Sequence, residues 1–120
     1  MLNLGVTMKV LVMEKETVLR HSLTYLLERR GLEVEETDLD EASMLKIEQS
    51  NGYDAIVFNG SPIEGRRPSS ELAVRAPRGT RLVCFSDEED RSSVNPMEVD
   101  AHLPFPFSSS ELLGALLGMK

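Results

Sequence analysis

The feature that most constrains the fold is a regular alternation of short apolar runs with stretches of helical periodicity. A short apolar run bounded by charged or turn residues is typical of a buried strand, whereas apolar residues three and four apart indicate a helix with one buried face. The runs are rich in branched residues, which favour strands. We predict five strands, at residues 9–13, 32–37, 55–59, 80–85 and 101–103.

Helices are expected in the segments between these strands. The first covers residues 17–30 and is closed by Gly31, and the second is capped by Asp38 or Asp40. A short helix starting at Ser69 or Ser70 is stopped by Pro77.

Two further helices are expected in the last third of the chain. The fourth begins in the acidic run 87–90 but must be shortened, because Asn95-Pro96 leaves room for little more than two turns. The fifth begins with the capping-box spacing of Ser108 and Glu111.

Five strands alternating with five helices require right-handed crossovers and a parallel sheet covered on both faces. The predicted fold class is therefore α/β, a doubly wound five-stranded parallel sheet in a flavodoxin-like three-layer sandwich with a shortened fourth helix. We expect residues 1–7 to form a leader and residues 8–120 a single domain.

Composition narrows the partners and the compartment of this 120-residue chain. A formal net charge of −7 opposes binding to nucleic acid or to anionic lipid. The apolar runs are far shorter than the roughly 20 residues of a membrane span, and the start carries no basic, apolar signal. Cys84 is the single cysteine, which suits a reducing compartment and argues against a zinc site. We predict a cytoplasmic protein that neither enters a membrane nor binds nucleic acid through this domain.

Asn59 is the central functional position, because it ends the third predicted strand just before Gly60. In an open α/β sheet, chemistry occurs just past the carboxyl ends of the strands. The sequence resembles the receiver domain of bacterial response regulators over about residues 8–119. The motifs that carry this resemblance are residues 9–14, residues 53–59 and residues 101–107.

The resemblance assigns a role to several positions. In the family, an aspartate ending the third strand accepts a phosphoryl group, and that position holds Asn59. The acidic pair that helps to bind magnesium is Glu14 and Lys15 here, and the lysine that grips the phosphoryl group is replaced by Phe105. The switch positions of the family correspond to Ser86 and His102, and Pro106 is retained after Phe105.

These replacements predict a site that has lost phosphorylation. A neutral amide cannot form an acyl phosphate, and magnesium prefers anionic oxygens. Because the charges of Glu14 and Lys15 cancel, we expect no metal, no cofactor, no catalytic residue and no enzymatic activity. Phe105 either fills the vacated pocket or forms an exposed partner anchor, and the resemblance implies a cis peptide bond before Pro106.

His102 admits two interpretations. It is either a pH- or partner-dependent switch acting with Ser86, or an edge histidine without a switching role.

The leading functional hypothesis is a pseudo-receiver that binds a protein partner or a second copy of itself independently of phosphorylation. The expected contact region is the C-terminal helix, whose leucines exceed what one side of a short helix buries. Two alternatives stay open: a flavodoxin-like enzyme or small-molecule binder, and the receiver part of a longer DNA-binding response regulator. The leucines of the candidate interaction face are Leu112, Leu113, Leu116 and Leu117.

Overall fold

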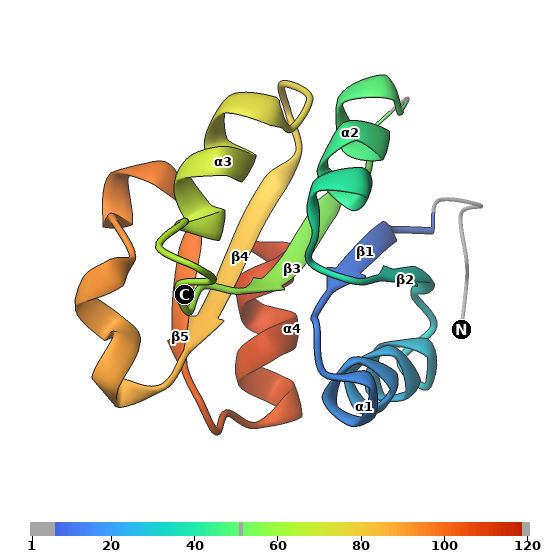
Figure 1. Ribbon diagram of the computed structural model, residues 1–120. Helices are drawn as coiled ribbons and strands as arrows, with labels where there is room; N and C mark the ends of the chain where they lie inside the picture. The colour runs from blue at the N-terminus through green and yellow to red at the C-terminus, as the bar shows by residue number, and fades with distance from the viewer. Residues whose placement is uncertain (1–6, 51, 119–120) are drawn as a thin grey trace.

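The sheet is the centre of the molecule. The computed structural model describes residues 7–50 and 52–118, and it contains five parallel strands in the order β2-β1-β3-β4-β5 (Figure 1). The predicted fold class is confirmed. The predicted leader, residues 1–7, lies outside the described residues except for Thr7. The strands are β1 (Lys9–Met13), β2 (Glu33–Thr37), β3 (Ala55–Asn59), β4 (Arg81–Ser86) and β5 (Ala101–Pro104).

Four α-helices cover the two faces of the sheet in the described part of the chain. Figure 1 shows α1 and α4 against one face and α2 and α3 against the other. Each face has its own apolar cluster, because successive side chains of a strand point to opposite sides. The helices are α1 (Thr17–Glu28), α2 (Glu41–Gln49), α3 (Pro68–Arg75) and α4 (Ser109–Leu117).

The expected fourth helix is replaced by two 3₁₀ turns, η1 (Glu88–Ser93) and η2 (Pro96–Glu98). The prediction of a shortened, irregular segment is confirmed. Pro96 cannot donate a backbone hydrogen bond and so stands at the first position of η2, where none is needed. Asn95 caps the same turn by accepting a hydrogen bond from the Met97 amide at 3.0 Å.

Local hydrogen bonds set the starts of the helices. Asp40, rather than Asp38, caps α2 by accepting a hydrogen bond from the Ser43 amide at 2.8 Å. The predicted capping box of α4 is present in both directions between Ser108 and Glu111. The predicted start of α3 at Ser69 or Ser70 is shifted, because Pro68 occupies the first turn.

Two of the four leucines predicted to form an interaction face belong to the core instead. Leu112 and Leu116 are fully buried between α4 and the sheet, in the cluster that also holds Val83 and Phe85. Leu113 packs against that cluster, and Leu117 is 57% exposed. The candidate face is therefore wrong for Leu112 and Leu116. Among the described residues, no helix has the length and apolar character needed to cross a membrane.

Gly60 is needed where the chain leaves β3. Its amide donates to the Phe85 carbonyl at 2.8 Å, which brings its backbone against β4. A Cβ atom at this position would lie 2.3 Å from Cys84 Sγ and 2.8 Å from Val94 Cγ2. Gly114, in α4, has nothing within 4 Å of the same point.

These two glycines provide a matched test of the fold. Gly60→Ala should lower the free energy of unfolding by about 1–3 kcal/mol, because buried neighbours must move. Gly114→Ala should raise it by about 0.5–1 kcal/mol through helix propensity. Urea unfolding followed by circular dichroism measures both, and equal stability of the two variants would contradict the packing described here.

Candidate functional site

Asn59 and Glu14 meet at the carboxyl end of the sheet. The pairing of Met13 with Phe58 places the residues that follow them side by side. Asn59 Nδ2 donates to Glu14 Oε1 at 3.0 Å, and Asn59 Oδ1 accepts from the Ser61 amide at 2.9 Å. Both polar atoms of the Asn59 side chain are therefore engaged by the protein.

Glu14 is a buried carboxylate, with only 3% of its surface exposed. Its second oxygen accepts a hydrogen bond from the Glu16 amide at 2.8 Å. A buried carboxylate is costly unless donors surround it, and here an amide side chain and a backbone amide supply them. In the described residues Glu14 forms no ion pair.

Lys15 does not pair with Glu14, although the sequence predicts that their charges cancel. Its side chain is exposed, and within the described ranges it forms no ion pair. Hydrogen-bond donors stabilise Glu14 instead. The cleft over the site is lined by Glu14, Lys15, Glu16, Leu39, Asn59, Ser61 and Ile63.

Phe105 does not fill this cleft, so the prediction that it packs the vacated pocket shut is wrong. Its side chain is 39% exposed, and its ring centroid lies 6.0 Å from that of Phe85 and 5.8 Å from that of Phe107. Tilted and edge-on aromatic contacts of this kind are favourable and leave part of the Phe105 ring exposed. The expected cis peptide bond between Phe105 and Pro106 is confirmed.

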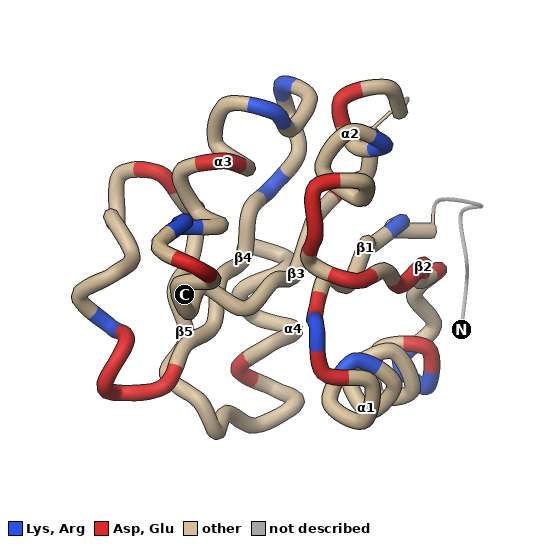
Figure 2. The backbone as a smooth tube through the Cα atoms, viewed as in Figure 1, with Lys and Arg blue, Asp and Glu red and all other residues tan. Residues whose placement is uncertain are grey.

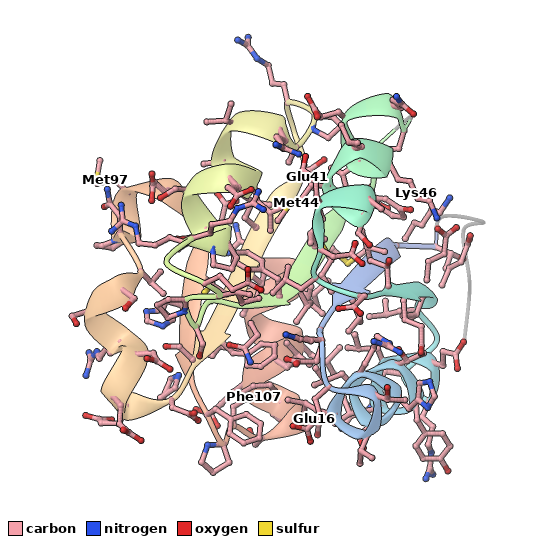
Figure 3. All side chains as sticks on the ribbon, in the orientation of Figure 1. Glu16, Glu41, Met44, Lys46, Met97 and Phe107 are labelled. Carbon is pink, nitrogen blue, oxygen red and sulfur yellow. The ribbon has the colours of Figure 1, made fainter. Side chains whose placement is uncertain are left out.

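Aromatic side chains therefore extend from the core to the surface beyond β5. Phe107 makes an edge contact with Phe85, with centroids 5.6 Å apart. Figure 3 shows Phe107 and Glu16 at the same lower end of the molecule. The alternative interpretation of Phe105, an exposed partner anchor, remains a prediction.

Ser86, at the end of β4, and His102, in the edge strand β5, are hydrogen-bonded to each other. Ser86 Oγ lies 2.6 Å from His102 Nε2, and Ser86 is 2% exposed. Burial, followed by the positive charge of Arg91, holds the pKa of His102 below its ordinary value. The pair does not reach the Asn59 cleft, since the groove that it lines shares no residue with that cleft.

The site does not fit the magnesium ion that the resemblance would imply. Glu14 is the carboxylate that contacts Asn59, and N–H donors occupy both its oxygens. Magnesium is bound in proteins through carboxylates and waters. The amide of Asn59 and a Glu14 carboxylate whose oxygens already accept hydrogen bonds are therefore poor magnesium ligands. Among the described residues, no group of three or more His, Cys, Asp or Glu side chains could hold a metal ion.

Arg20 supports the site and was missed by the sequence analysis. Its Nη1 donates to the Glu14 carbonyl at 2.8 Å, and its Nε lies 3.3 Å from Glu36 Oε1. His21 Nε2 lies 2.8 Å from the same carboxylate oxygen. This arrangement joins α1 to the edge strand β2 and fixes the turn after β1. Helical periodicity predicts which face of α1 carries Arg20, but it does not predict that the side chain reaches the Glu14 carbonyl.

A second charged cluster holds the loop between β3 and α3. Ile63 and Arg66 pair across a tight turn at Glu64 and Gly65, both with positive φ. Arg66 binds Glu71 through two nitrogens, and it donates to Glu41 at 2.8 Å. The hydrogen bonds that Arg66 donates to these carboxylates, that to Glu71 first, raise the pKa of Arg66. The loop is thereby attached to α2, beside the Asn59 cleft.

Solved receiver domains share this architecture. A receiver domain of Clostridium thermocellum has a TM-score of 0.78 at 17% identity, with 92% of each chain covered. The chemotaxis response regulator CheY4 of Vibrio cholerae has a TM-score of 0.75 at 21% identity, with 94% of this chain and 98% of that chain covered. The Thermotoga maritima response regulator TrrA in complex with Mg²⁺-BeF has a TM-score of 0.75 at 20% identity, with 93% of this chain and 98% of that chain covered.

The fold is that of a receiver domain. These identities show the fold alone. No protein-family model matches the sequence, and no curated protein matches it. The motifs that carry the resemblance in this receiver fold lie at β1, β3 and β5, and all three are strands of the sheet.

Restoring a carboxylate at position 59 tests the Asn59–Glu14 contact. Asn59→Asp replaces a donor by a second anion about 3 Å from buried Glu14, and we expect a loss of about 1–3 kcal/mol at neutral pH. Asn59→Ala is the control, because it removes the donor without adding charge. Lowering the pH from 8 to 5 should recover stability for Asn59→Asp more than for Asn59→Ala, as urea unfolding would measure.

The lowered pKa of His102 predicts a pH dependence of stability. Above its unfolded pKa, near 6.5, the imidazole is neutral in both states. As the pH falls below that value the unfolded chain binds the proton first, so the free energy of unfolding decreases. His102→Gln should lessen this decrease between pH 7.5 and 5, measured by urea unfolding. An unchanged slope would contradict the assignment, and His21, present in both proteins, serves as the internal control.

Proposed function

We propose that this chain is a pseudo-receiver, an interaction module that acts in a two-component-type signalling pathway without phosphorylation. The observation that carries the proposal is the contact between Asn59 and buried Glu14. The site is already satisfied by internal hydrogen bonds, and nothing in it calls for a metal or a phosphoryl group.

The chemistry of an amide supports this proposal. Phosphoryl transfer to an aspartate needs a carboxylate oxygen as the nucleophile. Asn59 Oδ1 is neutral and accepts the Ser61 amide, while Nδ2 donates its hydrogen to Glu14. Neither atom offers an anionic lone pair to phosphorus.

The surrounding positions support it as well. By the resemblance, Lys15 stands where a metal-binding acid belongs, and Phe105 stands where a phosphate-binding lysine belongs. The solved structure of TrrA is a complex with Mg²⁺-BeF. By the resemblance, this chain departs from the family pattern at Lys15, Asn59 and Phe105 and keeps an acid at Glu14 and a hydroxyl at Ser86.

A binding role requires a free surface and a partner suited to it. The net charge of −7 disfavours nucleic acid and anionic membranes and favours a protein with basic character. Leu117 and part of Leu113 remain as surface leucines on α4. We place this function in the cytoplasm and propose no catalysis and no cofactor.

A flavodoxin-like cofactor binder is less well supported. Phosphate groups in such proteins are held by backbone amides after the first strand. Here the Glu16 amide is already bound to the Glu14 carboxylate, and both acids would repel a phosphate.

The proposal is tested by adding Mg²⁺ and beryllofluoride to ¹⁵N-labelled protein. The amide resonances of Asn59, Ser61 and Ser86 should show no saturable shift. TrrA of Thermotoga maritima, treated identically, is the control that should respond. Saturable shifts centred on Asn59 would overturn the proposal.

A further inference from the structure

A groove opens beside β4 and β5 where the 3₁₀ turns replace a full helix. It has a volume of about 330 Å³, and Ser86 and His102 lie in it together with apolar wall residues. The groove is distinct from the Asn59 cleft, and the Asn59 site does not use it. Its lining residues are Ser86, Asp87, Glu88, Arg91, Val94, Pro96, His102 and Pro104.

The end of the groove at η1 is strongly acidic. Four consecutive acids, residues 87–90, comprise the residue before η1 and the first turn of η1, visible as the red segment at the lower left of Figure 2. In the part of the chain that the structure describes, none of these carboxylates forms an ion pair or a side-chain hydrogen bond. By contrast, Glu36, Glu41 and Glu71 are each bound by arginine.

We propose that this groove is the docking site for a basic protein segment with apolar side chains. The proposal rests on the proposed function and names the chemistry of its partner. Val94, Pro96 and Pro104 supply an apolar wall for aliphatic side chains. The unpaired acids beside them are complementary to arginine or lysine.

A second copy of this chain fits the groove less well. Self-association here would bring two runs of four unpaired acids together on chains that each carry a net charge of −7. Like charges that approach at an interface are unfavourable. Arg91 is the one arginine or lysine in the groove lining, and the acids of η1 outnumber it.

The floor of the groove adds a polar element. His102 Nε2 is bound to Ser86, and no hydrogen bond to its Nδ1 is formed within the described residues. That nitrogen can pair with a backbone group of an extended segment. Apolar walls, one polar contact and an acidic end together define the specificity of the site.

The test uses the full chain and two synthetic peptides. One peptide alternates arginine and leucine, and the other has glutamate in place of each arginine. With ¹⁵N-labelled protein, the basic peptide should shift Ser86, Val94 and His102 saturably, and the acidic peptide should not. Shifts centred elsewhere, such as on β2 or α2, would overturn the proposal.

A charge-matched pair of variants separates the groove from general attraction to an acidic protein. Asp87→Asn with Glu88→Gln and Glu89→Gln removes three charges at the groove. Glu28→Gln with Glu33→Gln and Glu64→Gln removes three charges elsewhere that form no ion pair among the described residues. The first triple should weaken peptide binding by about tenfold relative to the second. Equal weakening would overturn the proposal.

The outcome is separable from that of the proposed function. Beryllofluoride shifts at Asn59 would refute the pseudo-receiver whatever the peptide does. If beryllofluoride causes no saturable shift and the basic peptide does not bind in the groove, the docking site alone is refuted.

Discussion

The burial of Glu14 is the constraint on which the candidate site depends. A carboxylate with 3% exposure must be surrounded by donors or it destabilises the fold. The structure meets this need with Asn59 Nδ2 and the Glu16 amide, while Arg20 binds the carbonyl of the same residue. An aspartate at position 59 would remove a donor and add a charge. The asparagine therefore supplies a hydrogen-bond donor that this buried acid needs.

The second constraint is the replacement of a full helix after β4 by 3₁₀ turns. An α-helix at this place would bury an apolar stripe on the sheet. The 3₁₀ turns and the two residues between them bury Val94 alone and leave Met97 exposed, as Figure 3 shows at the upper left. The groove follows from this loss of cover. Under the proposed function the two features act together, because Asn59 offers no carboxylate nucleophile and the groove provides a surface for a partner.

The sequence was sufficient for the elements whose signals are local. The strands, the shortened segment at Asn95-Pro96 and the capping box at Ser108 all depend on neighbouring residues. Each was confirmed, and the predicted strand ends agree with the observed ones to within one residue. Predictions that needed side-chain direction failed. Phe105 turns onto Phe85 rather than into the cleft, and Leu112 and Leu116 face the core. Neither composition nor periodicity fixes the rotation of a helix or the path of a loop after a strand.

Gly60 lies between the Asn59 site and the groove. It follows Asn59 directly, its amide binds the Phe85 carbonyl, and it lies against Cys84 and Val94. Val94 lines the groove, so the two regions share one tightly packed contact. Packed contacts of this kind resist gradual deformation. The packing at Gly60 thus couples the position of the Asn59 turn to the wall of the groove. Under the proposed function, this coupling gives a partner a preformed groove that needs no phosphorylation to create it.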